Sequence, residues 1–322
     1  MTRVLTGIQS TGIPHLGNLL GAILPAIELS KNRNYASFYF IANLHTINQI
    51  KNGTELHKNT LDTAAVWLAC GLDTEKTFFY RQSDIPQVTE LMWYLLCFFP
   101  FSRMELAHSF KDKKDRLEDI NGGLFTYPLL MAADILLYDA NFVPVGKDQE
   151  QHIEMTRDVA GRFNNQMGEV FVLPEALINE NTKHIPGTDG TKMSKSKGNT
   201  INIFTDDKFL RKQIMSIETD STPLEEPKNT ENDTVFQLYK TMATENEIAE
   251  MKMNYEKGGY GYGHAKQALF EIILREFGEI REKYQYYSQN SSIVENELEK
   301  GAAKAKLIAD VTLAKVRNAL QL

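Results

Sequence analysis

The sequence predicts an α/β fold with a parallel sheet over residues 1–204 and a smaller all-helical domain over residues 205–322. Three observations support this division. Short β-favouring runs alternate with helical segments through the first part of the chain. Several of these runs are continuously apolar, which is typical of strands buried on both faces. From about Asp206 onward, the chain is richer in lysine and glutamate, and its apolar residues recur near helical spacing.

The overall composition is that of an ordinary globular protein. A length of 322 residues suits two domains, each with a core of its own. The formal net charge of −7 argues against a general nucleic-acid coat protein, but it is compatible with a localised basic patch. The two cysteines, Cys70 and Cys97, lie in apolar runs and lack metal-ligand spacing, so we expect reduced thiols. We also expect no signal peptide, no membrane span and a cytoplasmic location.

The first unit is a short strand around Val4–Thr6, a loop over residues 7–18 and a helix from Leu19 to Leu29. Gly7, Gly12 and Gly17 allow a ligand to approach the backbone closely, and a helix start directs free N–H groups at an anion. His15 and Asn18 add hydrogen-bond donors beside it. The loop is either a phosphate site or an ordinary strand-to-helix turn with a buried histidine, and its glycines alone do not decide between them.

Two more strands follow, with a helix between them. Residues 37–42 form an apolar run that ends at Asn43–Thr46, which places His45 at a strand end. A helix is expected from Thr54 to Cys70, and Thr77–Tyr80 is the third strand. Ligands of parallel sheets bind at the carboxyl ends of the strands, so we expect the site there.

The segment about 85–120 separates the two halves of the sheet. Its apolar run Leu91–Phe101 is either core or a subunit interface, and we favour an interface. The charged run Lys111–Asp119 is expected to be a solvated surface. Gly122 and Gly123 then break the chain before an apolar helix over Tyr127–Tyr138.

The apolar helix contains one carboxylate, Asp134, whose burial is unfavourable unless it is paired. Asp134 either caps backbone or bridges to an arginine, or it accepts a hydrogen bond from a mostly apolar ligand. An indole fits the description of a mostly apolar ligand that donates a hydrogen bond. Met131 lies one turn before Asp134 on the same face of the helix. The strand Phe142–Val145 follows, ends at Gly146–Gln149, and leads into a helix from Glu150 to Phe163.

A second loop, residues 190–199, combines lysines and serines with flanking glycines. Its ammonium groups are suited to negative charge that develops on a transferring phosphoryl group. By itself such a run is usually a solvated surface. Its pairing with the first loop gives it weight.

Together the two loops resemble the signature elements of class I aminoacyl-tRNA synthetases. His15-Leu16-Gly17-Asn18 is similar to their HIGH element, and residues 192–196 read KMSKS. The sequences around Thr126–Pro128, Met131–Tyr138, Val145–His152 and Gly7–Gly12 resemble the bacterial tryptophanyl-tRNA synthetase family. This resemblance runs from the N-terminus to about Lys228, and more loosely to the end.

The resemblance implies a Rossmann-like catalytic domain that joins tryptophan to ATP and then to tRNA(Trp). The implied catalytic residues are His15 and Asn18, which act near the α-phosphate of ATP, and Lys192 and Lys195, which hold the pyrophosphate. The remaining implied ATP contacts are Gln9, Ser10, Thr11, Gly17, Gly146, Lys147, Asp148, Ile185, Met193, Ser194 and Ser196. The implied tryptophan contacts are Asp134, Met131, Tyr127, Gln149 and His45.

The resemblance also implies partners. ATP brings Mg²⁺ with it, without a dedicated protein metal site, since no ligand cluster is visible in the sequence. The family is homodimeric, with the segment about 85–120 as our candidate interface. The helical domain, including the last helix over Ala302–Leu320 and its lysines, is expected to meet the anticodon.

At three positions the sequence departs from the usual family pattern. Lys147 stands where an acidic residue is frequent, Ser10-Thr11 replaces Pro-Ser, and Leu5 replaces an aromatic residue of the pocket wall. None of these departures removes a charged catalytic group.

Three alternatives remain at this point. A tyrosyl-tRNA synthetase shares the fold and a similar lysine loop, but it needs polar groups for a phenol. A synthetase-like binding or regulatory protein without catalysis would be expected to lose Lys192 and Lys195. A nucleotidyltransferase with a related histidine loop typically lacks the long helical C-terminal half.

Overall fold

The computed structural model contains one five-stranded parallel sheet, and it describes residues 1–106, 121–178 and 185–322. The sheet order is β3-β2-β1-β4-β5. The strands are β1 (Thr2–Ile8), β2 (Tyr35–Ile41), β3 (Phe78–Arg81), β4 (Phe142–Val145) and β5 (Glu175–Ile178). Every pairing is parallel, and Val4 pairs with both Ser37 and Phe142. The predicted parallel sheet is thus confirmed, while β5 has no counterpart among the predicted strands.

The order of the strands reverses beside β1. The chain first runs from β1 outward to β3 and then returns to place β4 on the other side of β1. In a parallel sheet, this reversal opens a crevice at the carboxyl ends of the two central strands. The loops that follow β1 and β4 therefore border the same crevice.

The helix after β1 is interrupted, whereas the sequence predicted one helix from Leu19 to Leu29. Its parts are α1 (Leu16–Asn18), the π-helical turn η1 (Leu19–Ile23) and α2 (Leu24–Ser30). The interruption has a local cause. Pro25 has no N–H to donate to the carbonyl four residues earlier, so a regular helical bond is missing at this point. The N–H of Leu24 reaches back five residues, to the carbonyl of Leu19.

Helices cover both faces of the sheet. Besides α1 and α2, the helices among the described residues before position 205 are α3 (Asn43–Thr46), α4 (Gly53–Ala69), α5 (Gln87–Phe98), α6 (Phe101–Met104), α8 (Gly122–Leu136) and α9 (Glu150–Met167). The expected chain break at Gly122 and Gly123 is wrong, because α8 begins at Gly122. The Asn121 side chain accepts a hydrogen bond from the Leu124 N–H and so caps the helix. The charged run 111–119 lies outside the described residues.

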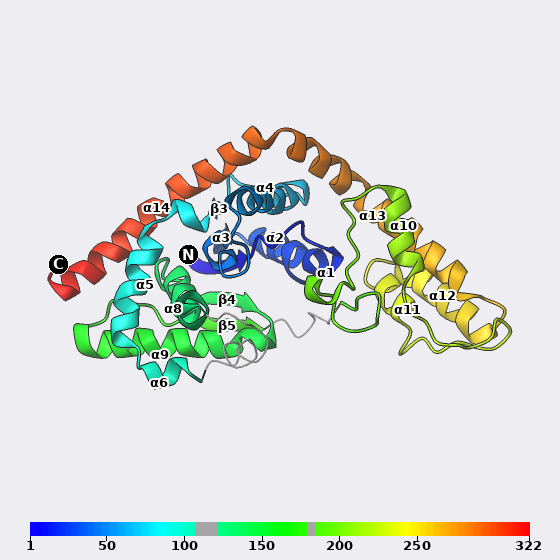
Figure 1. Cartoon of the computed structure of the whole chain (residues 1–322), viewed down its shortest axis with the longest axis horizontal. Helices are drawn as coiled ribbons and strands as arrows, with labels where there is room; N and C mark the ends of the chain where they lie inside the picture. Colours follow the sequence, from blue (N-terminus) through cyan, green and yellow to red (C-terminus); the bar gives the residue numbers. More distant parts are fainter. Residues whose placement is uncertain (107–120, 179–184) are drawn as a thin grey trace.

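The part after residue 205 is helical, as predicted. It consists of α10 (Asp207–Met215), α11 (Thr234–Tyr239), α12 (Glu245–Lys257), α13 (Tyr262–Gln289) and α14 (Ser291–Leu320). Asp206 caps α10 by accepting from the Phe209 N–H. In Figure 1, α13 and α14 form a bent arch over the sheet and its helices, with α10, α11 and α12 gathered under one end.

Two apolar cores lie on the two faces of the sheet. One face, with Tyr39, Ile41 and Phe79, packs against α2 and α4, and α13 joins the same core by packing on α4. The other face, with Phe38 and Tyr80, packs against α5, α8, α9 and α14. Residues on both sides of position 205 contribute to each core. The division into domains at that position remains a prediction.

Several basic side chains of α14 contact other parts of the protein. Lys304 donates to the Thr74 carbonyl, Lys315 contacts Asp139, and Arg317 forms two hydrogen bonds with Glu90, each of 2.7 Å. Lys306 pairs within the helix, with Asp310. The lysines that we expected to meet tRNA therefore mainly attach α14 to the sheet domain.

The apolar run Leu91–Phe101 has two kinds of surroundings. Leu91 and Leu95 are fully buried in a core, whereas Trp93 is 65% exposed and Phe101 is 66% exposed.

Across the described ranges of the chain, no helix is long and apolar enough to span a membrane.

Candidate functional site

The loop after β1 is closed by hydrogen bonds between His15 and Asn18. The Asn18 N–H donates to His15 Nδ1 at 3.3 Å, and the His15 N–H donates to Asn18 Oδ1 at 3.2 Å. Since Nδ1 accepts, the ring proton lies on Nε2. Burial, and then the nearby Lys195 charge, lower the pKa of His15 to about 4. His15 is therefore a neutral side chain that can donate one hydrogen bond.

Other residues of this loop have different surroundings. The Ser10 hydroxyl is fully buried between Thr46 and Thr60, at 3.3 and 3.2 Å, so it holds the loop against α3 and α4. Gln9 is exposed and accepts from Gln49. Gln9 is thus the one of these two whose side chain is open to a ligand.

The lysine loop packs directly on the loop after β1. The Gly17 N–H points at the Met193 sulfur at 3.3 Å, and the Leu16 N–H donates to the Ile201 carbonyl at 2.9 Å. Gly12 has a positive φ of 112°, and a Cβ built there would lie 3.3 Å from Lys195 Nζ. The two motifs, about 180 residues apart in the chain by their numbering, thus form one site.

The lysines of this loop have different electrostatic surroundings. The side chain of Lys195 is exposed as a whole, but burial around its ammonium group lowers its pKa to about 8. Lys192 lies 3.5 Å from Asp148 Oδ2, and both side chains are exposed. This pair connects the lysine loop to the segment after β4, which the sequence also assigned to ATP.

Asn199 holds the lysine loop together, although it was not among the predicted site residues. Its buried amide donates to the Asp189 carboxylate, the Thr191 hydroxyl and the Lys192 carbonyl. Its oxygen accepts from the Ser194 N–H at 2.7 Å. The sequence offered only an asparagine directly after the lysine-rich run as a signal, because the burial of Asn199 is visible in the structure alone. At the base of the loop, the Met193 N–H donates to the Ile185 carbonyl at 3.0 Å.

The segment after β4 forms a short 3-10 turn, η3 (Lys147–Gln149). Gly146 allows the Asp148 carboxylate to fold back over it, since a Cβ at Gly146 would lie 2.6 Å from Asp148 Oδ1. Lys147 and Asp148 are exposed, and Gln149 is half-buried. In the lysine loop, the hydroxyls of Ser194 and Ser196 lie 2.9 Å apart.

Asp134 is buried and paired with polar side chains, as the burial of a carboxylate in an apolar helix requires. It is 4% exposed. His45 Nε2 lies 3.0 Å from its Oδ2, and Gln82 Nε2 lies 2.9 Å from both carboxylate oxygens. Burial raises the pKa of Asp134, and the hydrogen bonds with His45 and Gln82 oppose that rise.

Gln82 was missed, although the rule that identified His45 also applies to it. It lies in the turn η2 (Gln82–Asp84), directly after β3, as His45 lies directly after β2. Both are strand-end residues of a parallel sheet.

Two further predicted tryptophan contacts, Tyr127 and Met131, lie on α8 together with Asp134. The Tyr127 hydroxyl is 2.8 Å from His152 Nε2, and its ring meets the His45 ring edge-on, with centroids 6.2 Å apart. Met131 is half-buried on the same helix as Asp134, and Leu5 is 2% exposed. The structure thus brings Asp134, His45 and Tyr127 together.

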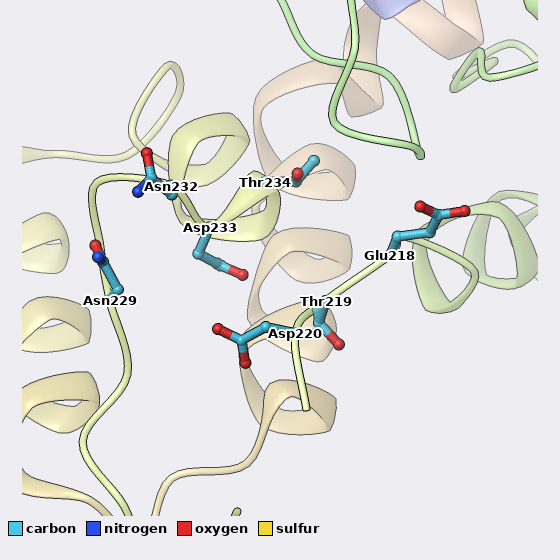
Figure 2. A pocket seen from close by; sticks show the side chains of 7 residues that line it. All are labelled: Glu218, Thr219, Asp220, Asn229, Asn232, Asp233 and Thr234. Atoms are coloured by element: carbon cyan, nitrogen blue, oxygen red, sulfur yellow. The ribbon is translucent and has the colours of Figure 1, made fainter. Parts of the chain in front are cut away.

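A separate cavity of about 290 Å³ lies among α10, α11 and the segment between them (Figure 2). Its lining is Glu218, Thr219, Asp220, Asn229, Asn232, Asp233 and Thr234. None of these is a predicted site residue, and three carboxylates make the cavity unsuited to phosphate.

In residues 1–106, 121–178 and 185–322, no three His, Cys, Asp or Glu side chains gather as metal ligands.

Comparison with known proteins yields close relatives. The family model described as class I tRNA synthetases (W and Y) matches residues 1–278. The tryptophan–tRNA ligase of Campylobacter jejuni strain RM1221 is 47% identical over 314 residues, which cover 98% of this chain and 98% of that protein. That of Fusobacterium nucleatum subsp. nucleatum is 46% identical over 321 residues, covering 99% and 97%. A crystal structure of the Campylobacter jejuni tryptophanyl-tRNA synthetase with ADP and tryptophan matches with a TM-score of 0.94, 46% identity and full coverage of both chains.

Proposed function

This chain belongs to the class I tRNA synthetases of the W and Y type, and from that premise we propose that its site makes it a tryptophan–tRNA ligase. It activates L-tryptophan with ATP, releases pyrophosphate, and transfers the tryptophan to tRNA(Trp). The observation that carries the proposal is the direct contact between the loop after β1 and the lysine loop, with Lys195 against Gly12. Identity of 46–47% to tryptophan–tRNA ligases over nearly the whole chain supports the choice of amino acid.

In the activation step, a carboxylate oxygen of tryptophan attacks the α-phosphorus of ATP. The bond from that phosphorus to the bridging oxygen of the β-phosphate breaks, and pyrophosphate leaves with the bond electrons. We assign His15 Nε2–H and the Asn18 amide to the oxygens of the α-phosphate. Lys192 and Lys195 neutralise the charge that develops on the pyrophosphate.

In the transfer step, the terminal ribose hydroxyl of the tRNA attacks the carbonyl carbon of tryptophanyl-adenylate, and AMP leaves. Neither step needs a covalent protein nucleophile. Catalysis consists of holding the reactants in line and stabilising charge. A neutral His15 suits this role, because it donates a hydrogen bond without exchanging a proton near neutral pH.

Selection of tryptophan is assigned to the pocket around Asp134. The carboxylate accepts the indole N–H, and Met131 packs on the ring. A phenol would present a hydroxyl to this carboxylate at a different position. For that reason we favour tryptophan over tyrosine within the family.

Mg²⁺ enters with ATP, and we assign its ligands mainly to the phosphates. The tRNA acceptor end meets the crevice beside Lys192 and Lys195, and the anticodon meets the helical part after residue 205. Charged tRNA is consumed by ribosomes, so we expect the enzyme to work in the cytoplasm.

We also propose that two copies associate through α5 and α6. Trp93 and Phe101 are large apolar side chains, each about two-thirds exposed, and aromatic residues are enriched at such interfaces. Trp93→Glu should therefore convert a dimer into a monomer in sedimentation-velocity experiments. Leu307→Glu, at an exposed apolar position of α14, is the matched control and should leave the sedimentation coefficient unchanged. A wild-type monomer would contradict this assignment.

Pyrophosphate exchange dependent on the added amino acid tests the main proposal. With ATP, Mg²⁺ and labelled pyrophosphate, label should enter ATP when tryptophan is added and not when tyrosine is added. Exchange with tyrosine and not with tryptophan would assign the chain to the tyrosyl branch, and equal exchange with both would refute the selection of tryptophan. No exchange with either amino acid would favour a binding or regulatory protein.

A further inference from the structure

We propose that Gln82 is a positioning residue of the tryptophan pocket, which holds the Asp134 carboxylate in its ionised form and aims it at the indole. This inference rests on the proposed function. Gln82 is 1% exposed, so its hydrogen bonds are made in a site that solvent does not reach. It contacts Asp134 and not the reacting atoms.

The orientation of the Gln82 amide is fixed by the protein backbone. The Leu44 N–H donates to Gln82 Oε1 at 3.1 Å. A backbone N–H can only donate, so the oxygen of the amide must face Leu44 and the NH₂ group must face Asp134. There Nε2 lies 2.9 Å from both carboxylate oxygens.

An NH₂ group offers hydrogens but no acceptor. It therefore forms its bonds with the lone pairs of a carboxylate, and a proton added to Asp134 would weaken at least one of them. Gln82 in this way favours ionised Asp134 against the burial that raises the Asp134 pKa. An ionised carboxylate is also the state that accepts an indole N–H most strongly.

The turn that carries Gln82 is braced on two sides. Ser83 exchanges hydrogen bonds with the Asn43 side chain, at 2.8 and 3.1 Å, which ties η2 to α3. Arg81, just before Gln82, pairs with Asp84 at 2.9 Å and with Glu295 of α14 at 2.7 Å. These contacts fix the backbone from which the Gln82 side chain extends.

Several titratable groups face Asp134 from the elements packed around it. They are His45 of α3, at 3.0 Å, and the phenols of Tyr80 on β3 and Tyr138 at the end of α8. Burial raises the pKa of both phenols, so they stay neutral. The pair Tyr127 and His152 lies beyond His45. Unlike these groups, Gln82 cannot titrate, and the Leu44 N–H fixes the direction in which its amide donates.

Two substitutions at this position predict opposite pH dependence. In Gln82→Met, Asp134 loses a donor and its pKa rises further. Relative to the wild type at the same pH, kcat/KM for tryptophan should then be about 10- to 100-fold lower near pH 7, and this deficit should become smaller as pH increases. In Gln82→Glu, two carboxyl groups must share a proton, so kcat/KM for tryptophan should fall as pH increases.

The experiment measures tryptophan-dependent pyrophosphate exchange between pH 6 and 9 for the wild type, both variants and Gln87→Met. Gln87 is a buried glutamine of α5 that bonds to Asp310, and its replacement should leave the pH profile unchanged. The KM for ATP should stay near the wild-type value in all four proteins. If Gln82→Met does not fold, the nearly isosteric Gln82→Glu still decides.

A loss that is independent of pH in either folded variant would overturn the proposal, because it would show only a structural role for Gln82. An unchanged kcat/KM would overturn it as well. A wild-type protein without tryptophan-dependent exchange would instead refute the proposed function itself. The two failures are therefore distinguishable.

Discussion

Lys195 carries its charge in surroundings that disfavour it. The ammonium group lies against the backbone of Gly12, and burial lowers its pKa from 10.5 to about 8. An ammonium group is charged below its pKa and neutral above it. Near neutral pH Lys195 is thus mostly charged, but it loses that charge within the range in which enzyme assays are made.

We predict that kcat/KM for ATP in the activation step decreases above about pH 8 in the wild type, because this quantity reports the free enzyme. Lys195→Arg should abolish that decrease, since a guanidinium stays charged at these pH values. Lys195→Ala should lower the activation rate by about 10²- to 10³-fold and leave the tryptophan dissociation constant nearly unchanged. The measurements are pyrophosphate exchange against pH and equilibrium binding of tryptophan.

The same decrease in Lys195→Arg would assign the titration to another group. A large rise of the tryptophan dissociation constant in Lys195→Ala would show that the loop supports the pocket instead of the phosphates.

The Asp134 carboxylate makes a prediction about substrate choice. Asp134→Ala should remove most of the preference for tryptophan over benzothienylalanine, an amino acid of similar size whose ring lacks the N–H. A site built around one hydrogen bond can favour its proper ligand by about 10⁴ or more. The ratio of the two kcat/KM values measures this preference. Equal losses for both amino acids would contradict the assignment.

Asp62→Ala is the matched control for this prediction. Asp62 is a buried aspartate of α4 that bonds to Lys58 and Tyr284, away from the pocket. Its replacement should reduce stability and leave the ratio intact.

At the scale of elements, the sequence predicted best where the signal is local. Continuous apolar runs gave β1 to β4, and the two loop motifs could be located by their letters alone. It failed where one side chain changes a boundary, as Pro25 of α2 does where η1 ends and Asn121 does where α8 begins. It also missed Gln82 and Asn199, because their partners come from other segments of the chain.

Asn199 gives the prediction for an element, the lysine loop. Asn199→Ala removes four hydrogen bonds that fix residues 189–194. We expect the activation rate to fall at least about 10-fold and the free energy of unfolding to fall by about 1–3 kcal/mol. Tryptophan affinity should hardly change. Rapid-mixing measurement of adenylate formation and urea unfolding check the three values.

Asn202→Ala is the control, because Asn202 lies three residues later and, within the described part of the chain, its side chain bonds only to the Phe204 N–H. A loss of activation equal to that of Asn199→Ala would show that the whole segment, and not the Asn199 anchor, governs the rate.

At the scale of the whole molecule, α14 returns to the sheet. It lies on β3 and α5, and its residues complete the core that also contains α8 and α9. The sequence predicted its helical pattern but not this packing. Helical spacing predicts that one face of the helix is buried. The partner of that face depends on contacts between residues more than 200 positions apart in the chain, such as Glu295 with Arg81.

At Gly301, α14 lies directly against β3. A Cβ built on Gly301 would overlap the carbonyl group of Phe79 in β3, and backbone cannot move aside as a flexible side chain can. Gly301→Ala should therefore push α14 away from β3. We expect the free energy of unfolding to fall by about 3 kcal/mol or more, even though alanine is the better helix former.

Gly278→Ala in α13 is the matched control. A Cβ at Gly278 meets no atom within 4 Å, so the same substitution in a neighbouring long helix should stabilise the protein by about 1 kcal/mol. Urea unfolding followed by circular dichroism measures both changes. Because β3 leads directly into Gln82, Gly301→Ala should also raise the KM for tryptophan. The KM for ATP should change less. A variant as stable as the wild type would mean that α14 does not lie on β3 in solution.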